Sequence, residues 1–334
     1  MDVLIDEFWG HFNKKSPITL IDIGARGGLN PNWQSFQKYL KVISFEPDKE
    51  EFERLEKASS ENVIYFNSAL YNMKSRIPLY LTQSRGCSSI FRPNREFLDQ
   101  FPDSNRFDIV QCVEVDTDTL DNQLDIYEID DIDFIKIDVQ GCELAVLEGA
   151  VDTLNNRHVF GLEVEVEFAP MYEKQPLFSD IDKFLTNLGF ELFDLRPYYW
   201  KRTAGKDYGG SKGQLIFADA LYLRSPQHID RALPGSDEIE NDLSQMKVLK
   251  AVSICILYGY LDYAFELFQK HRMLFTESEA TFFKRKMEKH ISLSKTMPNF
   301  FGRGKLADFF KTIYNILKPT HEWADSPMRL GNID

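Results

Sequence analysis

The sequence predicts an α/β protein: a doubly wound, mostly parallel sheet with a reversed last strand, followed by an all-helical extension. Three observations support this prediction. Short apolar runs alternate with helical patterns from Ile18 onward, which is typical of parallel strands with helices on both faces. The last two predicted strands, 190–195 and 215–223, are joined only by a loop at 196–214, so they should be antiparallel. Beyond residue 238 every segment reads as helix.

The individual elements follow from the periodicity of the apolar residues. Buried strands are expected at 18–23, 42–45, 63–66, 132–137 and 159–166, and an inserted hairpin or meander at 77–81 and 109–115. Helices are expected at 2–14, 31–39, 48–58, 142–154 and 179–188, the last capped by Ser179. Further helices are expected at 238–259, 261–272, 277–293 and 305–317. The composition changes at 225–238, which predicts two domains, 1–228 and 235–334.

The charge of the chain restricts its partners. The net charge is −13, whereas a nucleic-acid binder usually has a basic excess, so nucleic acid is not an expected partner. Residues 281–320 are the exception, with nine Lys and Arg against two acids. This stretch is either a solvated helical face or a docking surface for an acidic partner, an acidic surface of the same chain, or anionic lipid.

Cysteine usage and the terminal segments predict a cytoplasmic protein. The four cysteines lie far apart and show no metal-binding spacing, which indicates a reduced protein without structural zinc. The N-terminus lacks the basic and apolar regions of a signal peptide. No apolar run approaches the roughly 18 residues of a transmembrane helix. The helical tail could join copies of the chain or hold a partner enzyme.

The most informative motif is ITLIDIGARGG at 18–28, read with VISFEPD at 42–48. The first apolar run ends in Asp22 and enters a glycine-rich turn, and the second ends in an acid, Glu46. This is the layout of a nucleoside-binding βαβ unit, in which the turn admits the ligand and the acid accepts ribose hydroxyls. The alternatives are an ordinary strand-to-helix turn and a carboxylate that stabilises a helix N-terminus.

The glycine turn favours S-adenosylmethionine over a dinucleotide. A dinucleotide turn usually reads G-x-G-x-x-G because a pyrophosphate sits on the helix N-terminus, and residues 24–28 do not match that pattern. S-adenosylmethionine has no phosphate. Gly24 would let the backbone approach its methionine moiety, Asp22 would face its ammonium group, and Glu46 would accept hydrogen bonds from its ribose.

A second polar motif, DFIKIDVQGCE at 133–143, follows the predicted strand 132–137. Ligands of open α/β sheets bind beyond the carboxyl ends of the strands, so Lys136, Asp138, Gln140 and Glu143 are candidates for the site. The alternative is that Asp138 caps the following helix.

These motifs, with VDTDTLD at 115–121 and FIKIDVQGCELAVLEGA at 134–150, resemble the FkbM-type methyltransferases over residues 16–224. The resemblance implies a Rossmann-like class I methyltransferase fold, S-adenosylmethionine as methyl donor, and O-methylation of a sugar, nucleotide sugar, glycan or other natural-product hydroxyl. It implies nothing about the helical tail. The residues expected to bind the cofactor are Asp22, Gly24, Ala25, Arg26, Gly27, Glu46, Pro47, Asp48, Ser68, Ala69, Asp138 and Gln140.

A hydroxyl acceptor needs a base or a metal, because an alcohol is a poor nucleophile at neutral pH. Asp138 is the first candidate base and His158 the second, although a histidine before a strand more often has a structural role. Glu163 and Glu165 share one face of the strand 159–166. With Asp138 they could form an oxygen site for Mg²⁺, or else a solvated or arginine-paired cluster.

The substrate side is assigned to two loops. Tyr198, Tyr199, Trp200, Lys201 and Arg202 are expected in the loop 196–214, where aromatic faces would stack on sugars and cations would meet phosphate. Packing of these aromatics on the tail is the alternative. Ser88 and Ser89 lie in a loop that resembles a substrate loop of the family. Competing hypotheses for the whole chain are an NAD-type oxidoreductase and a non-catalytic scaffold that uses its tail.

Overall fold

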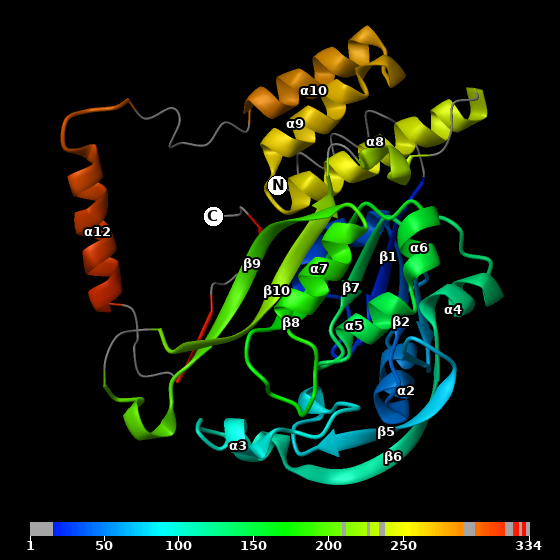
Figure 1. Ribbon diagram of the computed structural model, residues 1–334. Helices are drawn as coiled ribbons and strands as arrows, with labels where there is room; N and C mark the ends of the chain where they lie inside the picture. The colour runs from blue at the N-terminus through cyan, green and yellow to red at the C-terminus, as the bar shows by residue number, and fades with distance from the viewer. Residues whose placement is uncertain are drawn as a thin grey trace.

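The main sheet of the protein has eight strands in the order β11-β9-β10-β8-β7-β1-β2-β3 (Figure 1). The computed structural model describes residues 16–208, 212–225, 228–233, 238–289, 298–317, 323–326 and 329–331, so the helix expected at 2–14 lies outside the described residues. The strands are β1 (Ile18–Ile23), β2 (Leu40–Phe45), β3 (Val63–Phe66), β7 (Phe134–Ile137), β8 (Gly161–Glu167), β9 (Phe190–Trp200), β10 (Gln214–Arg224) and β11 (Ala324–Asp325).

Strand directions confirm the predicted fold class. Strands β3, β2, β1, β7 and β8 run parallel, whereas β10 is antiparallel to both β8 and β9. The reversed strand is the expected one, but β9 continues to Trp200 instead of ending at residue 195, and it pairs with β10 as far as Gln214.

Helices cover both faces of the sheet. Successive residues of a strand point to opposite faces, so Leu20 and Ile21 belong to two different cores. The face of Ile21 packs against α4 (Leu120–Ile126), α5 (Glu143–Glu148), α6 (Val151–Asn156) and α7 (Phe178–Asn187). The face of Leu20 packs against Trp33 and Phe36 of the 3-10 helix Pro31–Tyr39. Helix α2 (Lys49–Lys57) follows β2.

Two helix predictions need correction. The helix expected at 142–154 is two helices, α5 and α6, which are separated by Gly149 and Ala150. A Cβ at Gly149 would lie 2.1 Å from the carbonyl oxygen of Tyr71, so only glycine lets the two segments approach at this break. Helix α7 begins at Phe178, and the backbone N–H of Leu177 donates to Asp180, so Ser179 is not the cap. Gly189 follows the C-cap Leu188 with φ +85°, a conformation that glycine adopts readily at the end of a helix.

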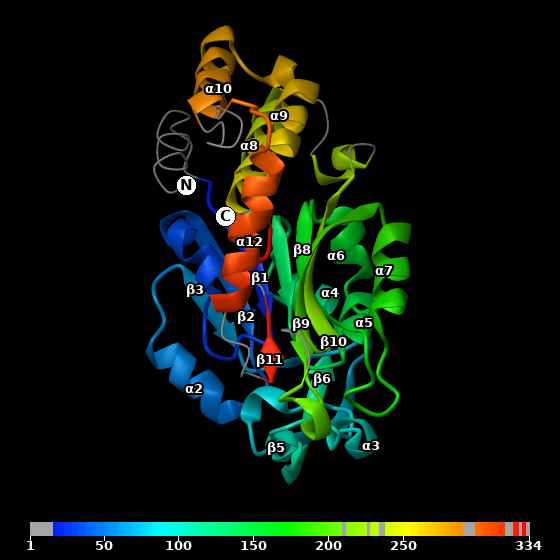
Figure 2. The ribbon, with the colours of Figure 1, turned by 90° about the vertical axis from the view of Figure 1, so that its left-hand side faces the viewer.

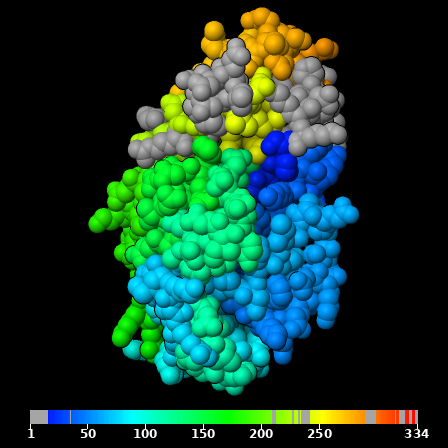
Figure 3. Space-filling model, turned by 90° about the vertical axis from the view of Figure 1, so that its right-hand side faces the viewer, coloured from blue at the N-terminus to red at the C-terminus, as the bar shows by residue number. Residues whose placement is uncertain are grey.

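A smaller sheet is inserted between β3 and β7, where the sequence predicts a hairpin or meander. Its strands β4 (Ala69–Leu70), β5 (Ser75–Thr82) and β6 (Ile109–Asp118) have the order β4-β6-β5. Helix α3 (Arg95–Leu98) lies in the connection between β5 and β6. The inserted segment forms one end of the molecule, and the C-terminal helices form the opposite end (Figure 3).

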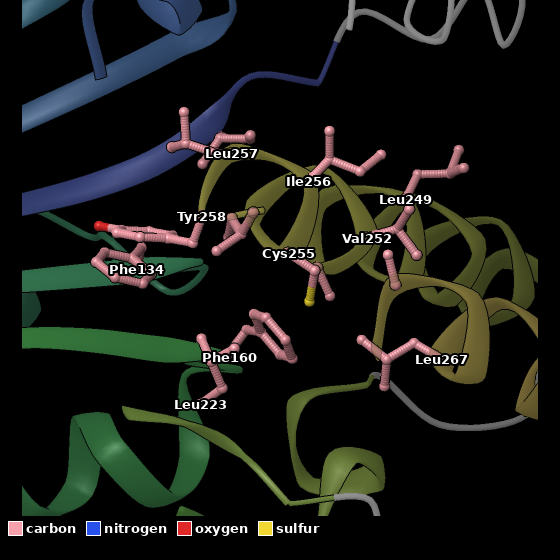
Figure 4. Close-up of a cluster of buried hydrophobic side chains, with 14 of the residues drawn as sticks. Phe134, Phe160, Leu223, Leu249, Val252, Cys255, Ile256, Leu257, Tyr258 and Leu267 are labelled. Atoms are coloured by element: carbon pink, nitrogen blue, oxygen red, sulfur yellow. The ribbon is translucent and has the colours of Figure 1, made fainter. Parts of the chain in front are cut away.

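The C-terminal segment contributes α8 (Glu238–Leu257), α9 (Leu261–Lys270), α10 (Glu277–Lys289) and α12 (Arg303–Leu317). Helix α8 shares a core with the sheet: Val252 and Ile256 pack in one cluster with Phe134, Phe160 and Leu223 (Figure 4). The change in composition at 225–238 therefore does not separate two hydrophobic cores. Helix α12, in contrast, stands away from the sheet and from α8–α10 in Figure 1, and it lies in front of them in the view of Figure 2.

Buried ion pairs tie α8 to the sheet. Lys247 and Lys250 place their Nζ atoms 2.5 and 2.9 Å from the two carboxylate oxygens of Asp133, just before β7. Asp133 also accepts the backbone N–H of Thr19 in β1 at 2.7 Å. Removing one partner of such a buried pair would leave an uncompensated charge, so this network fixes where α8 lies on the sheet.

Candidate active site

A cavity of about 240 Å³ opens beyond the carboxyl ends of β1, β2 and β7. Strand order reverses here, since β1 lies between β2 and β7, and open α/β sheets bind their ligands at such a point. The main sheet forms one wall of the cavity through Gly24, Glu46 and Asp138. The inserted sheet forms the other wall through Leu79 and Val115.

Gly24 brings the three segments of the main sheet together. Its backbone N–H donates to the carbonyl of Phe45 at 3.0 Å. Its φ is +79°, and a Cβ at this position would lie 1.9 Å from the carbonyl oxygen of Asp138. No other residue type fits there without moving the loop that carries Asp138.

Glu46, at the end of β2, is 3% exposed and lines the cavity. Burial raises the pKa of Glu46 to about 7. The backbone N–H of Asp48 donates to the Glu46 carboxylate at 2.8 Å and works against this shift. A buried acid that still has unused acceptor capacity on a cavity wall suits a ligand with hydroxyl donors.

Arg26 pairs with the acids around it. Its Nη2 lies 2.7 Å from Asp48 and 3.9 Å from Glu46, and its Nη1 lies 3.9 Å from Glu51 of α2. The guanidinium therefore joins the glycine turn to the start of α2.

Asp138 lies at the end of β7 beside a buried lysine. The Nζ of Lys136 is 3.7 Å from Asp138 and 3.8 Å from Asp22. Burial alone would lower the pKa of Lys136, but these two carboxylates raise it, so the lysine remains charged. The side chain of Asp138 is 37% exposed, whereas that of Asp22 is 3% exposed. Asp138 is thus the carboxylate of this group that a ligand in the cavity can reach.

Gln140 holds Asp138 in place. Its Nε2 donates to Asp138 at 2.9 Å and to Glu165 of β8 at 2.7 Å, and its Oε1 accepts from the hydroxyl of Tyr172 at 3.1 Å. The hydroxyl of Ser89 donates to the backbone carbonyl of Gln140 at 2.7 Å. The loop after β7 is therefore fixed from both of its sides.

The predicted magnesium ligands do not form one set. The ligand atoms of Asp138, Glu163 and Glu165 do not all lie within 4.8 Å of one another, a condition that Glu143, Glu165 and Glu167 meet. The carboxylate of Glu163 accepts from Asn30 at 3.1 Å and from the hydroxyl of Tyr258 at 2.7 Å. Strand direction explains the correction, because Glu163 lies two positions further from the carboxyl end of β8 than Glu165.

Burial also raises the pKa values of the glutamates in and near this group. It raises the pKa of Glu163 and of Glu143 to about 7, and that of Glu165 and Glu167 above the usual range. Raised pKa values favour the neutral form of these carboxyl groups, which lowers the repulsion between acids buried so close together.

Nine of the twelve residues expected to bind the cofactor line the cavity: Gly24, Arg26, Glu46, Pro47, Asp48, Ser68, Ala69, Asp138 and Gln140. The other three residues do not line the cavity. Asp22 contacts Lys136, Ala25 is buried, and the backbone N–H of Gly27 donates to Glu51 at 2.9 Å.

Sequence reasoning missed the residues that the inserted segment contributes to the cavity. These are Leu79, Leu81, Arg85, Gly86, Ile90 and Val115. One signal is present in the sequence, since Ile77, Leu79 and Leu81 alternate with polar or less apolar positions, as in a strand that covers something apolar. What they cover depends on the path of the insertion in space.

His158 is not at the cavity, which corrects its prediction as a second base. It precedes β8, and β8 starts beside the first residue of β7, at the sheet edge opposite Asp138. Its Nδ1 lies 3.4 Å from Asp131, and its backbone carbonyl faces Lys247 of α8. Its φ of +62° reflects a turn between α6 and β8.

Most residues assigned to the substrate side lie elsewhere. Ser88 lines the cavity, whereas Ser89 is buried and holds the loop of Gln140. The residues expected in the loop 196–214 are not cavity residues, because β9 is longer than predicted and takes up three of them. Within β9, the hydroxyl of Tyr198 donates to Asp219, Tyr199 pairs with β10 and β11, and Trp200 is buried among aromatic side chains. After β9, Lys201 is buried and the guanidinium of Arg202 donates to Gln214.

Fold and site together define the class of the protein. Class I S-adenosylmethionine-dependent methyltransferases have a mostly parallel sheet in which a strand such as β10 is reversed, and they bind their ligand where the strand order reverses. An acid after β2 that can accept ribose hydroxyls and a glycine turn that lacks the phosphate-binding pattern complete these features. The family model of the methyltransferase FkbM domain matches residues 22–192, which is 171 of 334 residues. The chain belongs to this family, and its general activity is methyl transfer from S-adenosylmethionine.

The solved structures to which the chain is similar are distant from it in sequence. Magnesium protoporphyrin IX methyltransferase from Synechocystis, with S-adenosylmethionine bound, is 12% identical; the match covers 67% of this chain and 77% of that chain, with a TM-score of 0.33. A TehB-like methyltransferase from Corynebacterium glutamicum is 11% identical, with 66% and 88% covered and a TM-score of 0.31. A search of curated proteins found no match.

Proposed function

We propose that this protein methylates a hydroxyl group of a sugar, nucleotide sugar, glycan or related natural product, with S-adenosylmethionine as donor and Asp138 as the base. The observation on which the proposal rests is the position of Asp138, an accessible carboxylate at the floor of the cavity that Lys136 and Gln140 hold in one orientation.

The donor would occupy the cavity between the glycine turn and the inserted sheet. Glu46 would accept hydrogen bonds from the ribose diol, and Gly24 would let the methionine moiety approach the backbone. The apolar side chains of Leu79, Leu81 and Ile90 would face the adenine and exclude water from it. Asp22 would act through Lys136 instead of touching the ligand.

Methyl transfer is an in-line displacement. The acceptor oxygen attacks the methyl carbon, the bond from that carbon to sulfur breaks, and S-adenosylhomocysteine leaves with the electron pair. The sulfonium is already a good leaving group, so the protein aligns the partners and removes the proton of the hydroxyl. Asp138 would take this proton. The Nζ of Lys136 lies 3.7 Å from Asp138 and holds its carboxylate beside the cavity.

The proposed reaction does not require magnesium. Mg²⁺ would serve a hydroxyl acceptor by lowering the pKa of that hydroxyl. Lys136, however, already supplies a positive charge beside Asp138, and the predicted ligand Glu163 is held by Asn30 and Tyr258. We expect turnover to survive treatment with a chelator, and loss of turnover that added Mg²⁺ restores would contradict this expectation.

Transfer of a labelled methyl group tests the acceptor and the base together. The full chain is incubated with methyl-labelled S-adenosylmethionine and a panel of sugars, nucleotide sugars and glycan extracts. We expect the label in a methyl ether, and a kcat about 100-fold or more lower in Asp138→Asn, because loss of a general base has this size of effect. Label on nitrogen or carbon, or full turnover by the variant, would contradict the proposal.

A further inference from the structure

Helix α12 exposes a wide apolar face. The exposed large apolar side chains of the described residues are scattered over the body but gather between residues 300 and 317. On α12 itself they are 36% to 76% exposed: Leu306, Phe309, Phe310, Ile313, Tyr314, Ile316 and Leu317. The helix stands away from the rest of the chain in Figure 1, and Phe301, just before it, is also exposed.

Helical geometry gathers these side chains on one side. At about 100° per residue, the seven apolar residues fill roughly half of the helix circumference, centred between Phe310 and Ile313. Lys305 lies at one border of this half, next to Ile316, and Lys311 lies beyond the other border, on the side of Tyr314. Arg303, in the first turn, falls within the apolar half, and its guanidinium donates to Asn299 at 3.2 Å. Asp308 lies on the side opposite the apolar half. Cations on both sides of the apolar half with an acid opposite are the pattern of a helix that lies in a membrane interface, because lysine side chains reach from the border to the headgroups.

The charges and the width of the apolar half argue against two other partners for this face of α12, a second copy of the helix and a protein groove. If two copies of α12 paired through their apolar faces, Lys305 and Lys311 of both copies would line the seam, and like charges would meet there. A groove-binding helix presents a narrower stripe than half of its circumference. Along the sequence, the exposed large apolar residues of the described body are isolated or in pairs, such as Ile109 with Val110.

We propose that α12 is an anchor that binds the protein to anionic phospholipid membranes. The apolar half, with Phe301, would enter the boundary between headgroups and acyl chains, and Lys305 and Lys311 would meet lipid phosphates. None of the described helices is long and apolar enough to cross a bilayer, so the anchor lies on the surface. The net charge of the whole chain is −13, and the basic stretch 281–320, which contains α12, is the part that an anionic surface would attract.

Flotation of the full chain with phosphatidylcholine vesicles that contain about one third phosphatidylglycerol tests this proposal. We expect the protein to float with these vesicles and to remain largely unbound with pure phosphatidylcholine. In Phe309→Ser/Phe310→Ser and in Lys305→Glu/Lys311→Glu the bound fraction should fall at least tenfold. Lys41→Glu/Lys57→Glu, with the same change of charge on exposed positions of the body, is the matched control and should bind like the unaltered chain.

Three results would overturn the proposal: no flotation of the unaltered chain, flotation of the α12 variants equal to that of the control, or a dimer in sedimentation that Phe309→Ser/Phe310→Ser dissociates. Binding of S-adenosylhomocysteine and the thermal midpoint should be unchanged in every variant, because these side chains are exposed and far from the cavity. This readout separates a failed anchor from a misfolded chain and from a failure of the proposed methyl transfer.

Discussion

Glu46 gives the cavity a pH dependence. The pKa of Glu46 is about 7, and only its ionised form accepts hydrogen bonds from both ribose hydroxyls. Its ionised fraction falls from about 90% at pH 8 to about 10% at pH 6. We therefore expect the affinity for S-adenosylhomocysteine to fall up to about tenfold over this range, with weak and pH-independent binding in Glu46→Gln.

Calorimetric titration at several pH values measures this effect. Glu56→Gln, on the exposed side of α2, is the matched control and should keep the pH dependence of the unaltered chain. If the affinity rises on acidification, or if Glu46→Gln binds as tightly as the unaltered chain, this acid does not hold the ribose.

Buried carboxyl groups also set how stability depends on pH. Glu163 and Glu143 have a pKa of about 7 in the folded chain, above the 4.5 of an exposed glutamate. Between these values the folded state binds more protons than the unfolded state, so stability falls as pH rises toward 8. We expect a higher thermal midpoint at pH 6 than at pH 8, and a smaller difference in Glu163→Gln. A midpoint that rises from pH 6 to pH 8 would be inconsistent with neutral buried glutamates.

At the scale of elements, the glycine turn after β1 is held by the loop after β7. Gly24 and Gly27 both have φ above +75°, so alanine strains both positions equally. A Cβ at Gly24 would meet the Asp138 carbonyl oxygen at 1.9 Å, whereas one at Gly27 meets no atom within 4 Å. Gly24→Ala should thus cost markedly more stability than Gly27→Ala and abolish methyl transfer. Equal unfolding free energies of the two variants would show that the contact is not structural.

The same scale shows why sequence reasoning found the cavity wall on the main sheet and missed the wall on the inserted segment. Gly24, Glu46 and Asp138 each follow a buried strand, and carboxyl ends of parallel strands meet at one edge, so their convergence can be predicted from order alone. Leu79, Arg85 and Val115 reach the cavity through the fold of an insertion, which no local pattern specifies. Tyr198 and Trp200 were assigned to a loop because the length of β9 depends on pairing with β10 and β11.

At the scale of the whole molecule, α8 belongs to the core of the methyltransferase sheet. Leu249 is 2% exposed and packs in the cluster shared with the sheet, whereas Leu243 of the same helix is 53% exposed. Leu249→Ala should lower the free energy of unfolding by about 2–5 kcal/mol, and Leu243→Ala by much less. Both should unfold in a single transition. A second transition that Leu249→Ala shifts alone would show that the helices form a separate domain.

The helical pattern of residues 238–257 predicts that α8 forms, but it does not predict that α8 packs against the sheet. Helix α8 has buried residues on all its sides near the sheet, and Lys247 and Lys250 look like surface residues until Asp133 is known to lie beneath them. A buried ion pair brings together residues that are more than 100 positions apart, and a single sequence contains no trace of that pairing.

The central claim is that the cavity beyond β1, β2 and β7 binds the methyl donor through Glu46, while Asp138 serves the acceptor. Calorimetric titration of S-adenosylhomocysteine into the unaltered chain, Glu46→Ala and Asp138→Asn tests it most directly. We expect micromolar binding to the unaltered chain, similar binding to Asp138→Asn, and none to Glu46→Ala. Absence of binding to the unaltered chain, or undiminished binding to Glu46→Ala, would contradict it.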